Sequence, residues 1–567
     1  MKLRNLWLAA AATASLATLT ACKSDAALGV DNKNSPDVAR AFATPDGVEN
    51  VLKNGFLQIF GATHGTSNAI WPAAQALALE SYGSVANFGL NTRGAIPRSV
   101  IDNTPGNVTM NENLRDFQQL FLRGRLIANA LGAFDVQLAA GGSIGSAFRD
   151  QRARSFGYFA MAMANGEGAL MYDSVATVNP KLDPIAIPPL SGYSAAMDVA
   201  LKQLDSAIAI ANVARTASGS SASALTGFLP VEWMRTPTAP TSLDDYIRMV
   251  RSMKARFRAG VARNPAERAK VSWTEVVNDA SNGIRSDWLL DLNASLGWDA
   301  SWLSQMAVST GWSGMTPAII GMADTTTGYA SWIALERGSR SAFLIQTPDA
   351  RFPQGSTRTE QTTNSPAFSA SLPSVYFRSR PPGEDAPGEA YGTSYYDHVR
   401  FTSYRAGASI GKWVWMAQAE NDMLQAEGLI ILGRAAEAVP LINRTRVANG
   451  LPAFPAGASA STRAPAQPGG SATSCVPRTP TGPGVLLECG TLLEAMKWEK
   501  RMESLYTGYS QWYFDSRGWN DLPAGTPLMY PVPYQEMLAR YEAFYNGQTD
   551  AIWQAVGSTY GFGVGSR

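Results

Sequence analysis

Apolar residues recur at three- and four-residue spacings over much of this 567-residue chain, a pattern that predicts amphipathic helices. The stretch 412–450 shows the pattern most clearly. It predicts two helices separated by a reversal at Gly433, the second ending near Gly450. Small residues at Ala426 and Ala438 would let the two helices pack closely, as in tetratricopeptide repeats.

Two acidic residues interrupt the apolar stripe of the first of these helices. Glu420 and Glu427 are seven residues apart, so they lie on the same helical face. A buried carboxylate needs a partner, and Lys497, Lys500 and Arg501 are basic residues available later in the chain. Alternatively, both glutamates face solvent at the edge of the stripe, and the pattern leaves both interpretations open.

Further helices are predicted through the N-terminal half and near the C-terminus. One helix has Thr44 as its N-cap and Pro45 in its first turn. The others are predicted at 71–81, 114–137, 147–171, 193–213, 243–262, 273–284 and from about Thr491 onward. Recurring helices at irregular separations predict an α-helical repeat array with degenerate units.

The character of the sequence changes between residues 287 and 401. Helical periodicity fades, Gly, Pro, Ser, Thr and Asn dominate, and many Trp and Tyr residues are spread through the segment. A loop region this long is usually functional or disordered, and its aromatic content argues against disorder. We therefore expect a loop-rich lobe inserted into the helical scaffold.

The N-terminus indicates export. Lys2 and Arg4 precede a short apolar run that ends in Leu19-Thr20-Ala21-Cys22, which is typical of a secretory signal peptide. The Leu-x-Ala-Cys ending resembles the bacterial lipobox, in which the cysteine is lipidated. The alternative is an ordinary signal peptide with a chance cysteine. We expect 1–21 to be a signal peptide, 22–37 a tether lipidated at Cys22, and the outer membrane to be the location, because Ser24 rather than Asp follows.

The charge composition excludes one class of partner. With 47 basic and 46 acidic residues the chain is almost neutral, which argues against nucleic-acid binding. Charged residues make up only 16 % of the chain, whereas Gly is abundant, as expected for an exported protein with long loops.

Two cysteines remain besides Cys22. Cys475 and Cys489 are close in sequence, and in an oxidising compartment such a pair predicts a disulfide, with free thiols as the alternative. A metal site would need more ligands than these cysteines and the two distant histidines, His64 and His398, provide. We therefore expect no metal and no cofactor.

Three segments together resemble the SusD/RagB family of outer-membrane lipoproteins. They are the entry that follows Cys22, the run AENDMLQAEGLIILGRAAEAVPLINRTRVANGLP, and the run LLEAMKWEKRMESLYTGYSQWYFDSRGW. The third run departs from the family pattern, because Thr507 and Ser510 stand where Glu and Arg are usual and Asp515 comes slightly late. The departure indicates a divergent branch.

The resemblance implies a mostly α fold, in which tetratricopeptide-like helix pairs form a right-handed superhelix that carries a loop-rich, SusD-like inserted lobe. The corresponding parts are an N-terminal helical part at 38–286, the lobe at 287–401, and a C-terminal part at 402–567 packed into the same domain. The implied role is a surface-facing lipoprotein that captures an oligosaccharide or peptide for a TonB-dependent, SusC-like β-barrel transporter.

Binding fits the residues better than catalysis. We find no G-x-S-x-G turn near either histidine, and the glycine-rich 561–565 has no helix after it, so we expect no catalytic residues. Paired carboxylates of a surface glycoside hydrolase remain an alternative, as does an envelope adaptor on a helical-repeat scaffold. Exposed aromatic rings would stack on sugars or peptides, although a single large aromatic ring is more often part of the core, so the expectation concerns the set and not any one member. The candidates are Trp298, Trp302, Trp312, Tyr329, Trp332, Trp71 and Tyr82.

Overall fold

The computed structural model describes residues 38–64, 70–83, 90–106, 111–217, 219, 221–236, 240–300, 313–385, 392–481, 487–558 and 560. Helices dominate this part of the chain, and its strands are short and form two-stranded sheets, which confirms the mostly α fold class. The predicted signal peptide at 1–21, Cys22, Trp302, Trp312 and the glycine-rich 561–565 lie outside the described residues. Among the described helices, none combines the length and the apolar character needed to cross a membrane.

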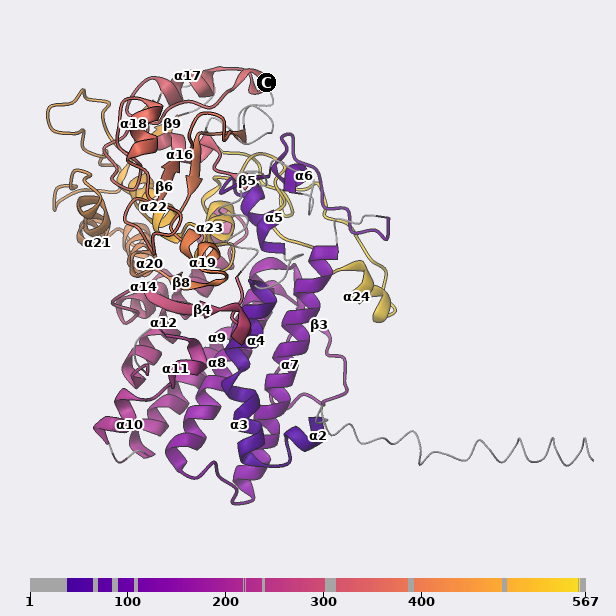
Figure 1. The fold of residues 1–567 in the computed structure, drawn as a ribbon. Coiled ribbons are helices and arrows are strands. Elements are labelled where there is room, and N and C mark those ends of the chain that lie inside the picture. Colours follow the sequence, from indigo (N-terminus) through magenta and orange to yellow (C-terminus); the bar gives the residue numbers. More distant parts are fainter. Residues whose placement is uncertain are drawn as a thin grey trace, which may run out of the picture.

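Long helices form a stack in the N-terminal half, in the lower part of Figure 1. The main ones are α3 (Pro45–Lys53), α4 (Gly55–Thr63), α7 (Asn111–Ala139), α8 (Ala147–Met171), α9 (Tyr193–Ala217), α12 (Leu243–Gly260) and α14 (Trp273–Ser281). Shorter ones are α2 (Val38–Ala41), α5 (Ile70–Leu77), α6 (Leu90–Gly94), α10 (Ala222–Thr226), α11 (Val231–Met234) and α13 (Pro265–Arg268). The predicted cap of α3 is confirmed, because Thr44 Oγ1 accepts a hydrogen bond from Gly47 N at 3.2 Å.

The stretch at 410–450 contains a strand as well as the two predicted helices. Ile410–Met416 is strand β8, which pairs antiparallel with β4 (Trp288–Asn293), so the prediction of a helix from residue 412 is wrong at its start. Alternating Trp and Val favour a strand once a partner strand is available. Helices α20 (Gln418–Ile431) and α21 (Ala435–Ala448) follow, and Gly433 reverses the chain with a φ of 77°.

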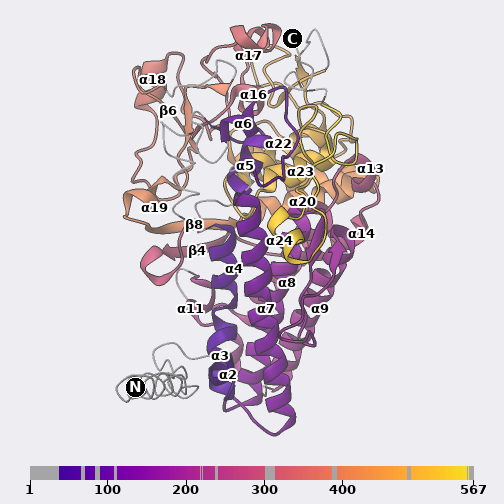
Figure 2. The same ribbon diagram turned by 90° about the vertical axis from the view of Figure 1, so that its right-hand side faces the viewer.

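The loop-rich lobe lies above the helical stack in both views (Figures 1 and 2). Besides β4, its elements are η3 (Ala294–Leu296), β5 (Ser313–Gly314), α16 (Pro317–Ile320), η4 (Gly321–Ala323), α17 (Gly328–Ala334), η5 (Arg337–Ser339), α18 (Arg358–Thr363), β6 (Phe377–Ser379) and β7 (Tyr396–His398); α19 (Thr402–Ala406) follows the lobe. Strand β1 (Tyr82–Gly83) pairs with β5, and one hydrophobic core contains residues of both the lobe and the stack. The lobe is therefore packed onto the scaffold.

The C-terminal part completes the fold around α20 and α21. It contains β9 (Arg478–Pro480), β10 (Leu487–Cys489), α22 (Leu492–Ser504), α23 (Gln511–Trp519) and α24 (Tyr534–Ala539); a hairpin of β2 (Ser174–Ala176) and β3 (Leu190–Gly192) precedes α9. Cys475 and Cys489 form the predicted disulfide. The tetratricopeptide-type right-handed superhelix stays a prediction.

Candidate functional site

The two glutamates of α20 are buried and paired with arginines. Glu420 is 0 % and Glu427 is 1 % exposed, which confirms the buried interpretation. Arg256 of α12 donates to both carboxylate oxygens of Glu420, at 2.7 and 2.6 Å, and Arg268 of α13 does the same for Glu427 at 2.8 and 2.6 Å. Such bidentate contacts satisfy a buried carboxylate well. They fix α20 against the α12–α13 segment.

The basic residues expected to pair with the glutamates of α20 form ion pairs with other carboxylates instead. Lys500 Nζ donates to Asp515 Oδ1 at 2.8 Å, and both Lys497 and Arg501 bond to Asp521. The prediction that these three residues pair with the glutamates of α20 is therefore wrong, because they lie on α22 and point toward α23 and the loop after it. Arg268 also contacts Asp515 at 3.2 Å, so the networks of α20, α22 and α23 are joined.

A further buried network attaches the lobe to α22. Arg351 of the lobe is held by Asp349 at 2.7 Å and contacts Glu499 at 3.0 Å and Glu503 at 3.1 Å. The hydroxyl of Tyr376, also in the lobe, donates to Glu503 at 2.7 Å. Charged groups that are buried together in this way constrain the two parts to one relative position.

The aromatic ligand candidates lie in the core wherever they are described. Trp71, Trp298, Tyr329 and Trp332 are 0–2 % exposed and Tyr82 is 5 % exposed. Trp298 packs against Phe56 and Phe60, and the Tyr329 and Trp332 rings stack with centroids 6.0 Å apart. Since Trp302 and Trp312 lie outside the described residues, a ligand cleft lined by members of this set stays a prediction.

Neither histidine is placed as an exposed proton acceptor. His64 caps α4, where its ring nitrogens contact Thr63 Oγ1 at 2.7 Å and Gly508 O at 2.8 Å, and burial lowers its pKa to about 4. His398 lies in β7 rather than in a loop, and burial lowers its pKa well below the usual range. Neither ring nitrogen of His398 has a hydrogen-bond partner among the described residues.

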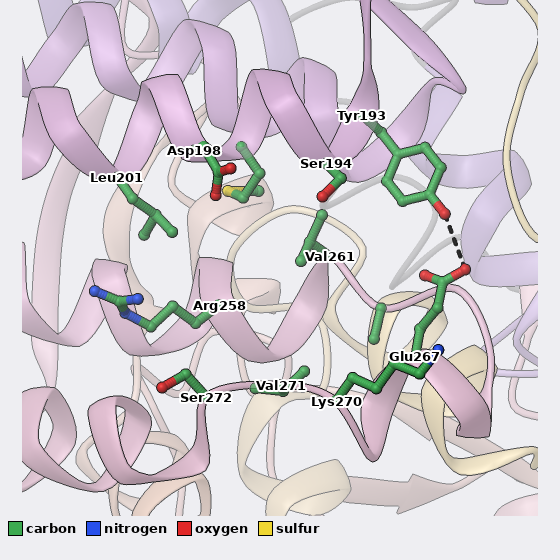
Figure 3. A pocket seen from close by; sticks show the side chains of 12 residues that line it. Tyr193, Ser194, Asp198, Leu201, Arg258, Val261, Glu267, Lys270, Val271 and Ser272 are labelled. Carbon is green, nitrogen blue, oxygen red and sulfur yellow. Dashed lines mark hydrogen bonds between the residues drawn. The ribbon is translucent and has the colours of Figure 1, made fainter.

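A hollow of about 430 Å³ opens where the N-terminal half of α9 faces the end of α12, α13 and the start of α14 (Figure 3). Its apolar surface comes from Met197 and Leu201 on one side and from Val261 and Val271 on the other. Charged and polar residues complete it: Tyr193, Ser194, Asp198, Arg258, Glu267, Lys270 and Ser272. Figure 3 shows the α9 side chains pointing across the hollow toward the facing segment.

Local hydrogen bonds hold the polar end of this hollow in place. The Tyr193 hydroxyl donates to Glu267 Oε1 at 2.9 Å, and burial together with this hydrogen bond raises the pKa of Tyr193 to about 12. Glu267 Oε2 accepts from Arg263 N at 2.9 Å. The side-chain oxygen of Asn264 caps α13 by accepting from Glu267 N at 2.9 Å. The hollow therefore offers an apolar surface bordered by charges of both signs.

Sequence reasoning did not find this hollow. The helical patterns at 193–213 and 243–262 and the turn at Asn264-Pro265 were all visible, but which helix faces face each other is decided by tertiary packing. Within the described residues, no three His, Cys, Asp or Glu side chains gather as metal ligands would. The chemistry of the hollow is that of binding through apolar contact and hydrogen bonds.

Comparison with known proteins gives a likeness in fold. No family model and no curated protein matches the chain. A SusD superfamily structure from Bacteroides fragilis is 10 % identical, with a TM-score of 0.49, over 88 % of this chain and 98 % of its own. One from Bacteroides vulgatus is also 10 % identical, with a TM-score of 0.49, over 85 % and 89 %. A SusD/RagB structure from Bacteroides thetaiotaomicron is 12 % identical, with a TM-score of 0.47, over 87 % and 94 %.

In fold, the chain is thus similar to SusD/RagB proteins. At identities this low, the likeness concerns the architecture alone and carries no information about a ligand or a partner.

Proposed function

We propose that this protein is a surface-exposed lipoprotein that captures a nutrient, an oligosaccharide or a peptide, and delivers it to a TonB-dependent, SusC-like barrel in the outer membrane. Its main support is how the two motif runs of the sequence meet in space. Glu427 from the first run and Lys500 and Asp515 from the second join one buried network through Arg268. The polar residues of the motifs thus build the scaffold that the resemblance implies.

The position of α2, the first described helix, fits this role. The tether at 22–37 leads into α2, and both views place α2 at the end of the helical stack that is far from α17 and α18 of the lobe. With Cys22 lipidated, the lobe would extend away from the membrane, toward incoming ligand. Two or more acyl chains give stable anchoring, since each buried methylene contributes about 0.8 kcal/mol.

We infer the ligand class, an oligosaccharide or a peptide, from the kind of surface that binds such ligands. Apolar patches bordered by hydrogen-bonding groups suit both the C–H faces and the hydroxyls of a sugar ring, and they suit peptide side chains and amides equally. The hollow beside Tyr193 has this character. The surface hydrolase and the adaptor remain the alternatives.

Affinity capture of the full-length protein tests the proposal. The protein, tagged at its C-terminus and expressed in its native host, would be extracted in mild detergent and its partners identified by mass spectrometry. We expect a TonB-dependent barrel in near-equal amount. Recovery of the protein alone, or with unrelated soluble proteins, would overturn the transporter role.

Two controls separate anchoring from partnership and binding from catalysis. The Cys22→Ser variant should lose labelling by radioactive palmitate and leave the membrane fraction. Incubation of the captured protein with oligosaccharides should release no shortened products; product formation would favour the hydrolase.

A further inference from the structure

Within the described residues, two fully buried arginines lack the carboxylate partners that the other fully buried arginines have. Arg351, Arg380 and Arg501 each form an ion pair within 3 Å, and Arg446 lies 3.5 Å from Glu499. Arg263 and Arg517 are equally buried, yet neither forms an ion pair with a carboxylate in the described part of the chain. A buried charge without a counter-charge is expensive, so these two positions require an explanation.

Main-chain carbonyls are the hydrogen-bond acceptors that Arg517 uses. Its Nη1 donates to Leu528 O and its Nη2 to Gly260 O, both at 2.9 Å, and its guanidinium lies 4.9 Å from the centre of the Phe514 ring. Its Nε has no partner within the described residues. The carbonyl contacts orient the guanidinium but do not neutralise it.

The charged groups near Arg517 do not neutralise it, so an added anion could pair with its guanidinium. Burial, with Arg263 nearby, holds the pKa of Arg517 well below its usual range. Glu267, Tyr193 and Tyr513 act in the opposite direction, and Tyr513 is a direct neighbour whose ring centre lies 5.3 Å from the Arg517 guanidinium. Asp173 also faces Arg263, but it is bonded to the hydroxyl of Tyr545.

Arg517 lines a hollow of about 360 Å³ that is separate from the one beside Tyr193. Helix α13 borders both, since Pro265 and Ala266 line this hollow and Glu267 lines the other. Its walls are mainly apolar and include Leu522, Leu528 and Val556. Three side-chain amides, those of Asn264, Asn520 and Gln554, also line it. A hollow of this size accommodates a small organic ligand.

We propose that this hollow binds a small organic carboxylate with an apolar body, with Arg517 supplying the counter-charge and the side-chain amides of Asn520 and Gln554 further hydrogen bonds. Carboxylate is the natural partner of a guanidinium, because the two can share parallel N–H···O bonds. The apolar walls at Leu522 and Leu528 would cover the body of the ligand. The site goes beyond nutrient delivery and does not depend on a barrel partner.

Short-chain probes test this site on the full-length protein in detergent, because pentanoate is too polar to be taken up strongly by micelles. Titration calorimetry would compare pentanoate with pentan-1-ol and pentylamine, which share its apolar chain. We expect pentanoate to bind at least tenfold more tightly than the alcohol and the amine not to bind. Equal binding of acid and alcohol, or no binding of the acid, would overturn the proposal.

Two variants locate the bound acid without removing Arg517, whose carbonyl contacts support the fold. Gln554→Glu places a competing carboxylate beside the hollow and should weaken pentanoate binding at least tenfold, as should Val556→Trp, which fills the hollow from its exposed edge. The matched control Gln467→Glu, in a loop that does not line the hollow, should bind pentanoate normally. If both hollow variants also bind it normally, the acid binds elsewhere and the proposal is wrong.

Discussion

At the scale of single residues, buried arginine–carboxylate pairs determine how the helices of this protein are joined. Arg256 and Glu420 are both nearly inaccessible to solvent and share two hydrogen bonds. Removing one partner leaves the other charge buried and unpaired, which costs far more than the intact pair contributes. The first prediction rests on this asymmetry.

The Glu420→Gln variant should lower the free energy of unfolding by about 3–5 kcal/mol, because Arg256 keeps its charge in the core. Urea unfolding followed by circular dichroism measures the change. The matched control is Glu437→Gln on α21, whose exposed pair with Arg434 should contribute little. Similar losses in both variants would contradict the importance of burial.

Two buried carboxyl groups, which form no ion pair within the described residues, make stability depend on pH. Burial raises the pKa of Glu80 and of Glu167 from 4.5 to about 8. Between these values the folded protein keeps both protons while the unfolded chain releases them, so stability falls as pH rises from 4.5 to about 8. The expected loss is on the order of 4 kcal/mol per group at the upper end of this range.

The Glu167→Gln variant should reduce this dependence, since glutamine resembles the neutral acid but cannot ionise. Thermal unfolding midpoints at constant ionic strength would be compared between pH 5 and pH 8. The exposed Glu275→Gln serves as the control and should retain the full slope. An unchanged slope for Glu167→Gln would show that this carboxyl group is ionised in the folded protein.

At the scale of elements, close approach of helices depends on glycine at defined positions. A Cβ added to Gly166 of α8 would lie 2.1 Å from the Phe257 ring of α12. Neither atom can move freely, because both helices are packed in the core. Gly61 of α4 differs, since an added Cβ there would come no closer than 3.8 Å to the end of the flexible Arg123 side chain.

The Gly166→Ala variant should therefore destabilise the protein by about 1–3 kcal/mol through overpacking. Gly61→Ala, its matched control, should be neutral or stabilising by up to about 1 kcal/mol because alanine favours helices. Urea midpoints of the two variants give the comparison. A stable Gly166→Ala protein would mean that α8 and α12 can separate without cost.

At the scale of the whole molecule, the lobe and the helical scaffold behave as one unit because charged groups connect them. The hydroxyl of Tyr376 and the guanidinium of Arg351, both in the lobe, meet Glu503 of α22. Tyr395 is a tyrosine of the same lobe that does not link it to α22. The centre of its ring lies 4.0 Å from the guanidinium of Arg358, and within the described residues its hydroxyl forms no hydrogen bond to α22.

The Tyr376→Phe variant should loosen the lobe alone. A hydrogen bond to a charged group contributes about 1.5–3 kcal/mol, so amides of β6 and β7 should exchange with deuterium roughly tenfold faster or more, whereas those of α8 should not change. Tyr395→Phe is the control from the same lobe and should exchange like the unaltered protein. Faster exchange throughout would indicate global destabilisation instead.

The amino-acid sequence by itself predicted the long helices, the cap at Thr44 and the disulfide. These depend on neighbours in the chain: the period of apolar residues in α3 and α12, the Thr44 cap, the reversal at Gly433, and the short separation of Cys475 from Cys489. The resemblance to SusD/RagB proteins likewise came from local motif runs, and the observed fold is similar to theirs.

Only the tertiary structure decided which partners each residue has. The run 412–416 became a strand because β4 was available to pair with it, and Glu420 and Glu427 pair with arginines more than 150 residues away in sequence. Both hollows are formed by segments that meet only when the chain folds, and so is the surrounding of Arg517, which has no carboxylate partner within the described residues. Pair interactions of this kind depend on distance in space, and a periodic pattern specifies only which face of a helix is buried.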